Sequence, residues 1–368
     1  MVRAGPDPDF ASWGNIVKPR LAEFLICPEC RGPLRLDVRK QEHEEIVEGE
    51  FECRQCSLGY PIRGGIPRFV PGDAYAASFS FEWKRWRRTQ FDTATRQTSE
   101  TTFLASTGIR AADLRGKLVL DAGCGAGRYM DLAAQAGAEV LGVDLSLAIE
   151  VAKENLGHYP NTHFIQADLL ALPLRPGIFD VAYSLGVLHH TPSTRYGFSQ
   201  VAQRVKPGGE VALWVYPRRR LTETFRYFPG QVNEVLAHDV RFRVPPRGMG
   251  LMRRLAPLLD GIMETSSRVE RFFTTRLPAR WLYALCHVAI PLYYLYRIPL
   301  FYPLRLVTKI AMDPDPEWRA LDTFDWYSTK YQWKHTYEEV RAWFAESRLE
   351  DIALLPCPVA VRGRKAAA

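Results

Sequence analysis

The ten residues LVLDAGCGAG, Leu118 to Gly127, constrain the fold of this chain more than any other stretch. An apolar run ends in an acid, Asp121, and three glycines follow at every second position. The pattern predicts a buried parallel strand and a tight turn, with a helix over Arg128–Gln135. A pyrophosphate bound at such a turn would meet the Asp121 carboxylate, so a ligand that carries positive charge fits better.

Four further segments continue the alternation of strand and helix: AEVLGVDLS, THFIQADLLALP, FDVAYSLGVLHH and KPGGEVALWVY. This order predicts an α/β fold with a doubly wound parallel sheet. Asp144 and Asp168 end the second and third strands, at the sheet edge where such folds bind ligands. S-adenosylmethionine carries an ammonium and a sulfonium and no phosphate. We expect Asp144 to accept its ribose hydroxyls and Asp168 its adenine amino group; the alternative is that both acids cap the following helices.

Five segments together resemble the class I S-adenosylmethionine-dependent methyltransferases: LDAGCGAGRY, GVDLS, QADLLALP, GVLHHTPS and KPGGEVALWVY. The resemblance covers roughly 75–217 and 321–363, and it implies the cofactor, the reaction type and a seven-stranded Rossmann-like sheet. The cofactor-binding residues expected on this basis are Asp121, Gly123, Gly125, Gly127, Asp144, Leu145, Asp168, Leu169 and Ser184.

Two histidines, His189 and His190, follow the fourth strand, where an acceptor would approach the methyl group. An imidazole is a suitable general base for an oxygen or nitrogen acceptor, so both are candidate catalytic residues. The alternative is that a histidine only hydrogen-bonds the loop. Methyl transfer from a sulfonium can also proceed by alignment alone, without a base.

Two CxxC pairs near the N-terminus supply Cys27, Cys30, Cys53 and Cys56, with 22 residues between the pairs. Four thiolates on two tight turns are typical of a structural zinc ribbon. A redox role is the alternative, but neither CxxC has a βαβ context. The segment YPIRGGIPRF resembles the small zinc-ribbon proteins that partner tRNA methyltransferases, and this resemblance covers about residues 21–70.

The remaining segments complete the expected organisation: a zinc ribbon over 21–70, lid or linker helices over 71–115, a cofactor-binding core over 116–217, a mostly helical cap over 218–320 and the rest of the core over 321–363. The cap is basic, with 17 Lys and Arg against 9 Asp and Glu. The segment SFSFEWKRWRRTQFD is interpreted as a lid, with plain packing or a nucleic-acid patch as alternatives.

The last segment reads as a loop, a helix over Thr336–Ser347 with a Thr336–Glu339 capping box, and two strands, the final one antiparallel. Similar methyltransferases place acceptor residues in such a loop and under the lid. Packing of these aromatic residues on the cap is the alternative. The acceptor candidates are Trp83, Asp325, Tyr327, Tyr331 and His335.

The cap segment Trp281–Val307 is apolar, with Arg297 and Arg305 as its only full charges. Pro291, Pro299 and Pro303 interrupt it, so it is not expected to span a bilayer. We expect it to fold onto the sheet and wall an acceptor pocket; the alternative is contact with a membrane surface.

We expect methyl transfer to a small or lipid-like metabolite. The alternatives are a methyltransferase for tRNA, rRNA or protein, and a non-catalytic cofactor-binding scaffold. The segment MVRAGPDPDF has no pattern of a secretory signal, and the cysteines suit a reducing compartment, so a cytoplasmic location is expected. The sequence favours no oligomeric state and does not choose among O-, N- and C-methylation.

Overall fold

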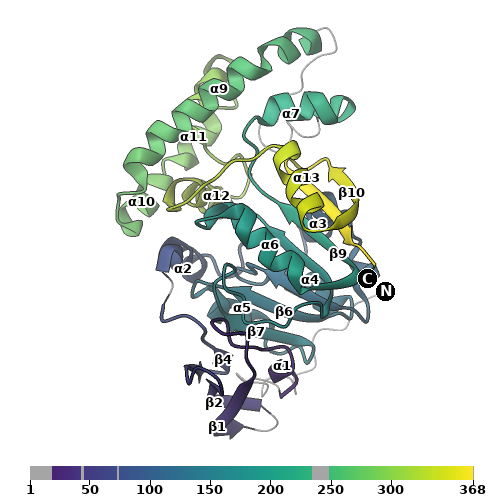
Figure 1. Cartoon of the computed structure of the whole chain (residues 1–368). Coiled ribbons are helices and arrows are strands. Elements are labelled where there is room, and N and C mark those ends of the chain that lie inside the picture. The colour runs from purple at the N-terminus through teal and green to yellow at the C-terminus, as the bar shows by residue number, and fades with distance from the viewer. Residues whose placement is uncertain (1–18, 43–44, 73, 234–247, 368) are drawn as a thin grey trace.

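A computed structural model describes residues 19–42, 45–72, 74–233 and 248–367. Its main feature is a seven-stranded sheet in the order β10-β11-β9-β8-β5-β6-β7 (Figure 1). The first five strands in chain order are parallel, and β11 lies antiparallel between β9 and β10. The strands are β5 Leu118–Ala122, β6 Glu139–Asp144, β7 Thr162–Gln166, β8 Phe179–Leu185, β9 Val205–Trp214, β10 Leu349–Leu355 and β11 Ala360–Lys365. The predicted doubly wound sheet is confirmed.

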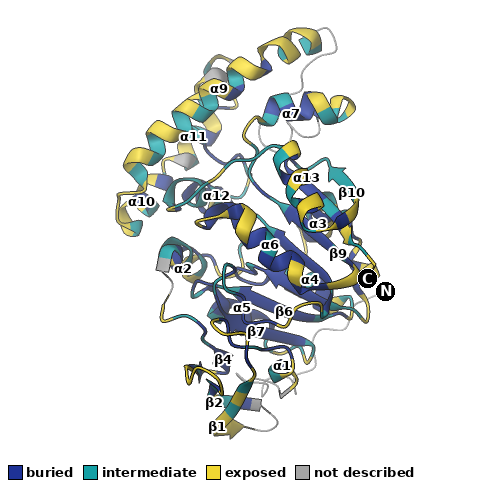
Figure 2. Ribbon diagram, viewed as in Figure 1, coloured by how far each residue is buried: buried dark blue, intermediate teal, exposed yellow. Residues whose placement is uncertain are grey.

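Successive residues of a strand point to opposite faces of the sheet, and here both sets are buried. Val119 and Val140 belong to one core cluster, and their neighbours Leu120 and Leu141 belong to the other. Figure 2 shows the central strands as almost wholly buried. The helices that surround the sheet are α2 Ala77–Arg85, α3 Ser99–Thr107, α4 Arg128–Gln135, α5 Ala148–Leu156, α6 Thr194–Arg204 and α13 Tyr337–Glu346, with short helices η2 Ala74–Ala76, η3 Ala111–Leu114 and η4 Leu188–His190.

The capping box before α13 is confirmed, since Thr336 accepts from the Glu339 N–H and Glu339 accepts from the Thr336 N–H. The prediction of a loop before α13 is wrong for residues 321–328. Those residues belong to α12, Pro316–Ser328, which also crosses the expected boundary at 320/321. Asp315 caps α12 by accepting from the backbone N–H groups of Glu317 and Trp318.

The N-terminal sheet contains β1 Leu34–Glu42, β2 Glu45–Cys53, β3 Gly59–Arg63 and β4 Ile66–Pro67, preceded by α1 Pro19–Ala22. It packs against the β7 edge of the large sheet. Phe51 and Ile165 belong to one buried cluster, and the Phe69 N–H donates to the Gln166 carbonyl at 2.8 Å. The ribbon and the large sheet therefore share a core.

The cap lies at the opposite end of the molecule from the ribbon (Figure 1). Its elements are α7 Arg220–Tyr227, η5 Pro229–Gln231, α9 Met249–Thr274, α10 Ala279–Cys286, α11 Ala289–Leu295 and η7 Pro299–Leu306. Residues 234–247 of the expected cap fall outside the described residues, as does the N-terminal segment MVRAGPDPDF. The predicted division of Trp281–Val307 into short pieces is confirmed. Among the helices described here, none has the length and apolar character needed to cross a membrane.

The shared core generates a stability prediction. Phe51→Ala removes a ring that is 1% exposed and should cost about 3–5 kcal/mol, in one transition that unfolds ribbon and large sheet together. Thermal unfolding followed by far-UV circular dichroism and by tryptophan fluorescence checks this. Val38→Ala, at a ribbon position that is 45% exposed, is the matched control and should change little. A separate early transition that alone shifts in Phe51→Ala would contradict a shared core.

Candidate functional site

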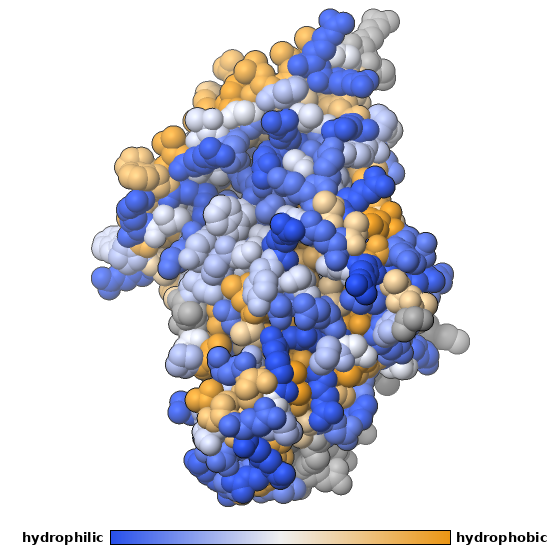
Figure 3. All heavy atoms as spheres, in the orientation of Figure 1, coloured by the Kyte–Doolittle hydropathy of each residue, from blue (hydrophilic) through white to orange (hydrophobic). Residues whose placement is uncertain are grey.

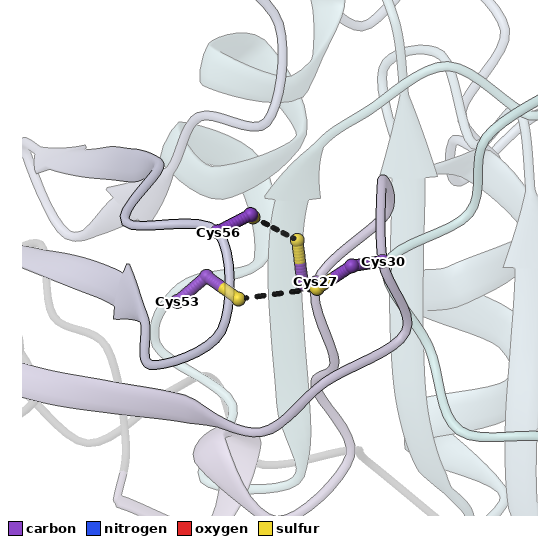
Figure 4. A group of neighbouring side chains, drawn as sticks. All are labelled: Cys27, Cys30, Cys53 and Cys56. Atoms are coloured by element: carbon purple, nitrogen blue, oxygen red, sulfur yellow. Dashed lines mark hydrogen bonds between the residues drawn. The ribbon is translucent and has the colours of Figure 1, made fainter.

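The four cysteines of the ribbon converge on one point (Figure 4). Cys27 and Cys30 come from the turn before β1, whereas Cys53 ends β2 and Cys56 lies in the turn before β3. Their sulfur atoms all lie within 4.8 Å of one another, with 3.6 Å between Cys27 and Cys56 and 3.3 Å between Cys30 and Cys53. Four thiolates around a zinc ion at about 2.3 Å would lie somewhat under 4 Å apart, so the cluster fits a structural zinc.

The second site is built around the glycine turn after β5. Gly123 and Gly125 have φ of 91° and 54°, where side chains are strained. A Cβ on Gly123 would lie 2.3 Å from Val187, and one on Gly125 would lie 3.2 Å from Trp83. Gly127 serves packing instead, because its Cβ would meet Leu156 at 2.6 Å and it does not line the cavity beside the turn.

Asp144, at the end of β6, fixes this turn. One carboxylate oxygen accepts from the Gly125 N–H at 2.9 Å, and the other accepts from the backbone and hydroxyl of Ser146 at 2.8 and 2.7 Å. Burial raises the pKa of Asp144, and these hydrogen bonds to its charged form oppose that rise. The carboxylate therefore lies at the edge of the cavity with its loop already in place.

Asp121, at the end of β5, is 3% exposed, and its Oδ2 has no hydrogen-bond partner among the described residues. Burial raises its pKa to about 8, the hydroxyl of neighbouring Tyr183 opposes that rise, and the charge of Asp144 adds to it. A buried carboxylate oxygen without a partner is costly unless a ligand supplies a donor. An ammonium would satisfy it, so these residues fit the amino acid part of S-adenosylmethionine.

The remaining cofactor candidates divide into two groups. Leu145 and Leu169 line the cavity, as do Asp121, Gly123, Gly125 and Asp144. Ser184 does not, because it is buried and its hydroxyl donates to the Ala122 carbonyl at 2.8 Å. Asp168 lies behind the lining, where one oxygen accepts from the Tyr75 hydroxyl at 2.9 Å. An adenine contact by Asp168 stays a prediction, and Tyr75, which lines the cavity, was missed.

One cavity of about 1110 Å³ continues from the glycine turn to the cap. Its walls come from α2, the strand ends, α12 and the inner face of α9. Trp83, expected at the acceptor, packs over Gly125 at the cofactor end. The cavity is large enough for the cofactor and a second molecule of moderate size.

The two candidate catalytic histidines have different surroundings. His189 is 0% exposed, stacks on Tyr216 at 3.9 Å between ring centroids, and does not line the cavity. His190 lines the cavity; its Nδ1 lies 2.8 Å from the Tyr331 carbonyl, and its Nε2 lies 4.0 Å from Asp325. Because a carbonyl only accepts, Nδ1 carries the proton and Nε2 is left as an acceptor. Burial lowers the pKa of His190 and keeps the ring neutral, although the Asp325 charge opposes this.

The acceptor candidates of the C-terminal segment also differ in position. Asp325 and Tyr327 line the cavity, on α12 and not on a loop. Tyr331 contributes its carbonyl to His190 but does not line the cavity. His335 points elsewhere, with Nε2 3.0 Å from the Thr194 hydroxyl and its ring against Trp343.

Sequence reasoning missed Glu82 and Asp322, which also line this part of the cavity. Glu82 is 2% exposed, and its Oε2 has no partner among the described residues. Burial raises the pKa of Asp322 to about 7, and the charge of Asp325 adds to the rise. Glu82 gave no signal in sequence, because it lies in a helix whose neighbours are aromatic and basic.

The expectation that Trp281–Val307 walls the pocket is mostly wrong. Of the residues in that range whose side chains the structure describes, only Arg305 and Leu306 line the cavity. Leu282 and Cys286 pack instead on Trp86 and Phe324 of the lid and α12. At the cap, α9 contributes the apolar residues Met252, Leu259 and Met263 to the wall.

Comparisons with known proteins agree with both sites. One family model, described as a methyltransferase domain, matches residues 120–213, and another, described as Trm112p-like protein, matches residues 18–65. The chain is 34% identical over 143 residues to a ubiquinone biosynthesis O-methyltransferase of Aromatoleum aromaticum, covering 38% of this chain and 57% of that protein. It is 33% identical over 203 residues to a tRNA U34 carboxymethyltransferase of Klebsiella pneumoniae, and this match covers 53% of this chain and 54% of that protein.

A solved S-adenosylmethionine dependent methyltransferase from Mesorhizobium loti is 31% identical, with a TM-score of 0.27 over 30% of this chain and 50% of that one. The matches span about half the length of these curated relatives. The chain therefore carries a methyltransferase domain, matched over residues 120–213, preceded by a Trm112p-like segment, matched over residues 18–65.

The unpartnered Asp121 generates a binding prediction. Below its pKa of about 8 Asp121 is protonated and neutral, so it cannot pair with an ammonium. Affinity for S-adenosylhomocysteine should fall by up to about tenfold per pH unit below that value, and Asp121→Asn should remove most of this dependence. Calorimetric titrations between about pH 6 and 8 check it. Asp113→Asn, at an exposed acid paired with Arg110, is the control. A wild-type affinity that does not change with pH would contradict the assignment.

Proposed function

We propose that the protein transfers a methyl group from S-adenosylmethionine to a hydroxyl or amine of a small, largely apolar acceptor. The observation that carries this proposal is one cavity whose lining includes Asp121 and Asp144 beside the glycine turn together with His190 and Asp325. The cofactor supplies an electrophilic methyl group on a sulfonium sulfur. The chain itself must orient the cofactor and the acceptor and must remove one proton from the hydroxyl or amine that is methylated.

Asp121 would hold the ammonium of the cofactor, and Asp144 would accept its ribose hydroxyls. Trp83 packs over Gly125 and would cover the bound molecule and exclude water from it. Leu145 and Leu169 provide apolar surface for the adenine ring. Each of these roles uses a group that already lines the cavity.

The chemistry of the acceptor follows from an excess of hydrogen-bond acceptors. Nε2 of His190 is buried without a partner among the described residues, and Asp325 lies 4.0 Å from it. Groups of this kind need donors, which an acceptor hydroxyl or amine supplies. His190 would take the proton of the nucleophile at Nε2, and Asp325 would stabilise the resulting imidazolium.

The body of the acceptor is inferred from the cap end of the cavity. Met252, Leu259 and Met263 of α9 and Leu306 of η7 give this end flexible aliphatic walls. Such walls gain from contact with an apolar chain or ring. tRNA is nevertheless the rival acceptor, because a tRNA-modifying relative and the Trm112p-like ribbon point towards it.

Incubation with cofactor labelled on its methyl group and with fractionated cell extract tests the proposal. We expect label in the lipid or small-molecule fraction. Label confined to RNA or protein would contradict the proposed acceptor. Cofactor binding without turnover in any fraction would favour a non-catalytic scaffold.

The role of His190 generates a kinetic prediction. His190→Asn keeps a side-chain donor for the Tyr331 carbonyl but removes Nε2, so methyl transfer should fall by about 10²- to 10⁴-fold with cofactor affinity retained. The wild-type rate should be lost only below the usual histidine range, because the pKa of His190 is lowered. His335→Asn, away from the cavity, is the matched control. An unchanged rate in His190→Asn would show that alignment suffices without a base.

A further inference from the structure

The outer surface of the cap carries most of the exposed apolar side chains of the described chain. Of the large hydrophobic residues that are exposed, 16 of 21 lie between Leu251 and Val307. They include Phe273 at 63%, Trp281 at 61% and Leu300 at 80% exposed. Figure 3 shows hydrophobic surface gathered at the cap end of the molecule. Scattered exposed apolar residues are ordinary, but a concentration of this kind marks a contact surface.

The pattern along α9 shows that this surface is built into the helix. Leu251, Leu255, Leu258, Ile262, Val269 and Phe273 are all exposed. Their spacings of three, four and seven residues place them on one face of a helix. The other face packs inward, where Ala256 is buried among Leu221 and Phe225 of α7. Thus α9 presents one apolar face to the cavity and α7, and a second to the outside.

The charges of the same surface are of one sign. Between Met249 and Val307 the exposed charged residues are all arginines: Arg253, Arg254, Arg268, Arg276, Arg280 and Arg297.

The acids of this segment are turned inward and already engaged. Asp260 accepts from the N–H groups of Leu221 and Thr222, and Glu270 accepts from the Tyr327 hydroxyl. Glu264 pairs with Lys334 and also with Arg268. The outward face therefore combines aliphatic and aromatic side chains with positive charge.

We propose that the outer face of α9, α10, α11 and η7 docks on an anionic membrane surface. Apolar side chains with surrounding arginines suit insertion beside acidic headgroups, in the manner of an interfacial amphipathic helix. A nucleic acid would use the arginines but gains little from Leu, Ile and Val, which neither stack on bases nor contact phosphates. Docking does not depend on the proposed methyl transfer.

The position of α9 connects this face to the cavity. Met252, Leu259 and Met263 line the cavity, while Leu255, Leu258 and Ile262 of the same turns face outward. Only one helix then separates the bilayer from the proposed acceptor site. This arrangement suits an acceptor that resides in the membrane.

Co-sedimentation of the full-length protein with vesicles tests the proposal. We expect binding to phosphatidylcholine vesicles that contain about 30 mol% phosphatidylglycerol, weak binding to phosphatidylcholine alone, and loss of binding as salt rises from about 0.05 to 0.5 M. Arg254→Gln/Arg276→Gln, two exposed arginines that flank the apolar face of α9, should weaken partitioning by about 30-fold. Leu258→Gln/Phe273→Gln should weaken it by about tenfold or more.

Matched controls lie away from the cap. Arg115→Gln/Arg341→Gln removes two exposed arginines, and Val38→Gln/Leu104→Gln changes two exposed apolar residues. Both should bind vesicles as the wild type does, and S-adenosylhomocysteine affinity verifies that every variant is folded. Absence of binding to anionic vesicles at low salt would overturn the proposal. So would equal losses in the cap and control variants, or a concentration-dependent dimer that only the cap variants disrupt.

Discussion

The hydrogen bond from the Gly125 N–H to the Asp144 carboxylate is the contact on which the cofactor site depends. It joins the turn after β5 to the end of β6, and so fixes backbone that could otherwise take many conformations. With the turn held, Asp121 lies at the end of β5, lines the cavity and keeps one buried oxygen without a hydrogen-bond partner among the described residues. Burial and the charge of Asp144 both raise the pKa of Asp121, so a ligand that brings positive charge favours the ionised form of Asp121.

The large sheet and its cofactor end could be predicted from the sequence, because strand periodicity and the acids at strand ends are local signals. Side-chain direction could not. Ser184 and Gly127 sit in the right motifs, but Ser184 bonds to the Ala122 carbonyl and Gly127 packs on Leu156. Glu82 lies in a segment with no acid pattern, and only the tertiary fold places it beside Asp325. Helix α12 was missed because its cap, Asp315, lies before the segment that was interpreted as a loop.

The two additions to the sheet differ in how they are joined to it. The ribbon shares a buried cluster with β7. Cys27 and Cys53 of the four-cysteine cluster belong to the same core as Ile165 of β7. In the cap, by contrast, many of the apolar side chains are exposed on its outer face. Composition predicted the amount of apolar surface in Trp281–Val307 but not its direction, since three short helices can bury or expose the same residues.

A crystal structure with S-adenosylhomocysteine bound tests the central claim most directly. The account predicts that the ligand amino group lies within hydrogen-bond distance of Asp121 and that its ribose hydroxyls lie on Asp144, with Trp83 over the glycine turn. A ligand whose ribose and amino group both lie away from these two carboxylates would contradict it.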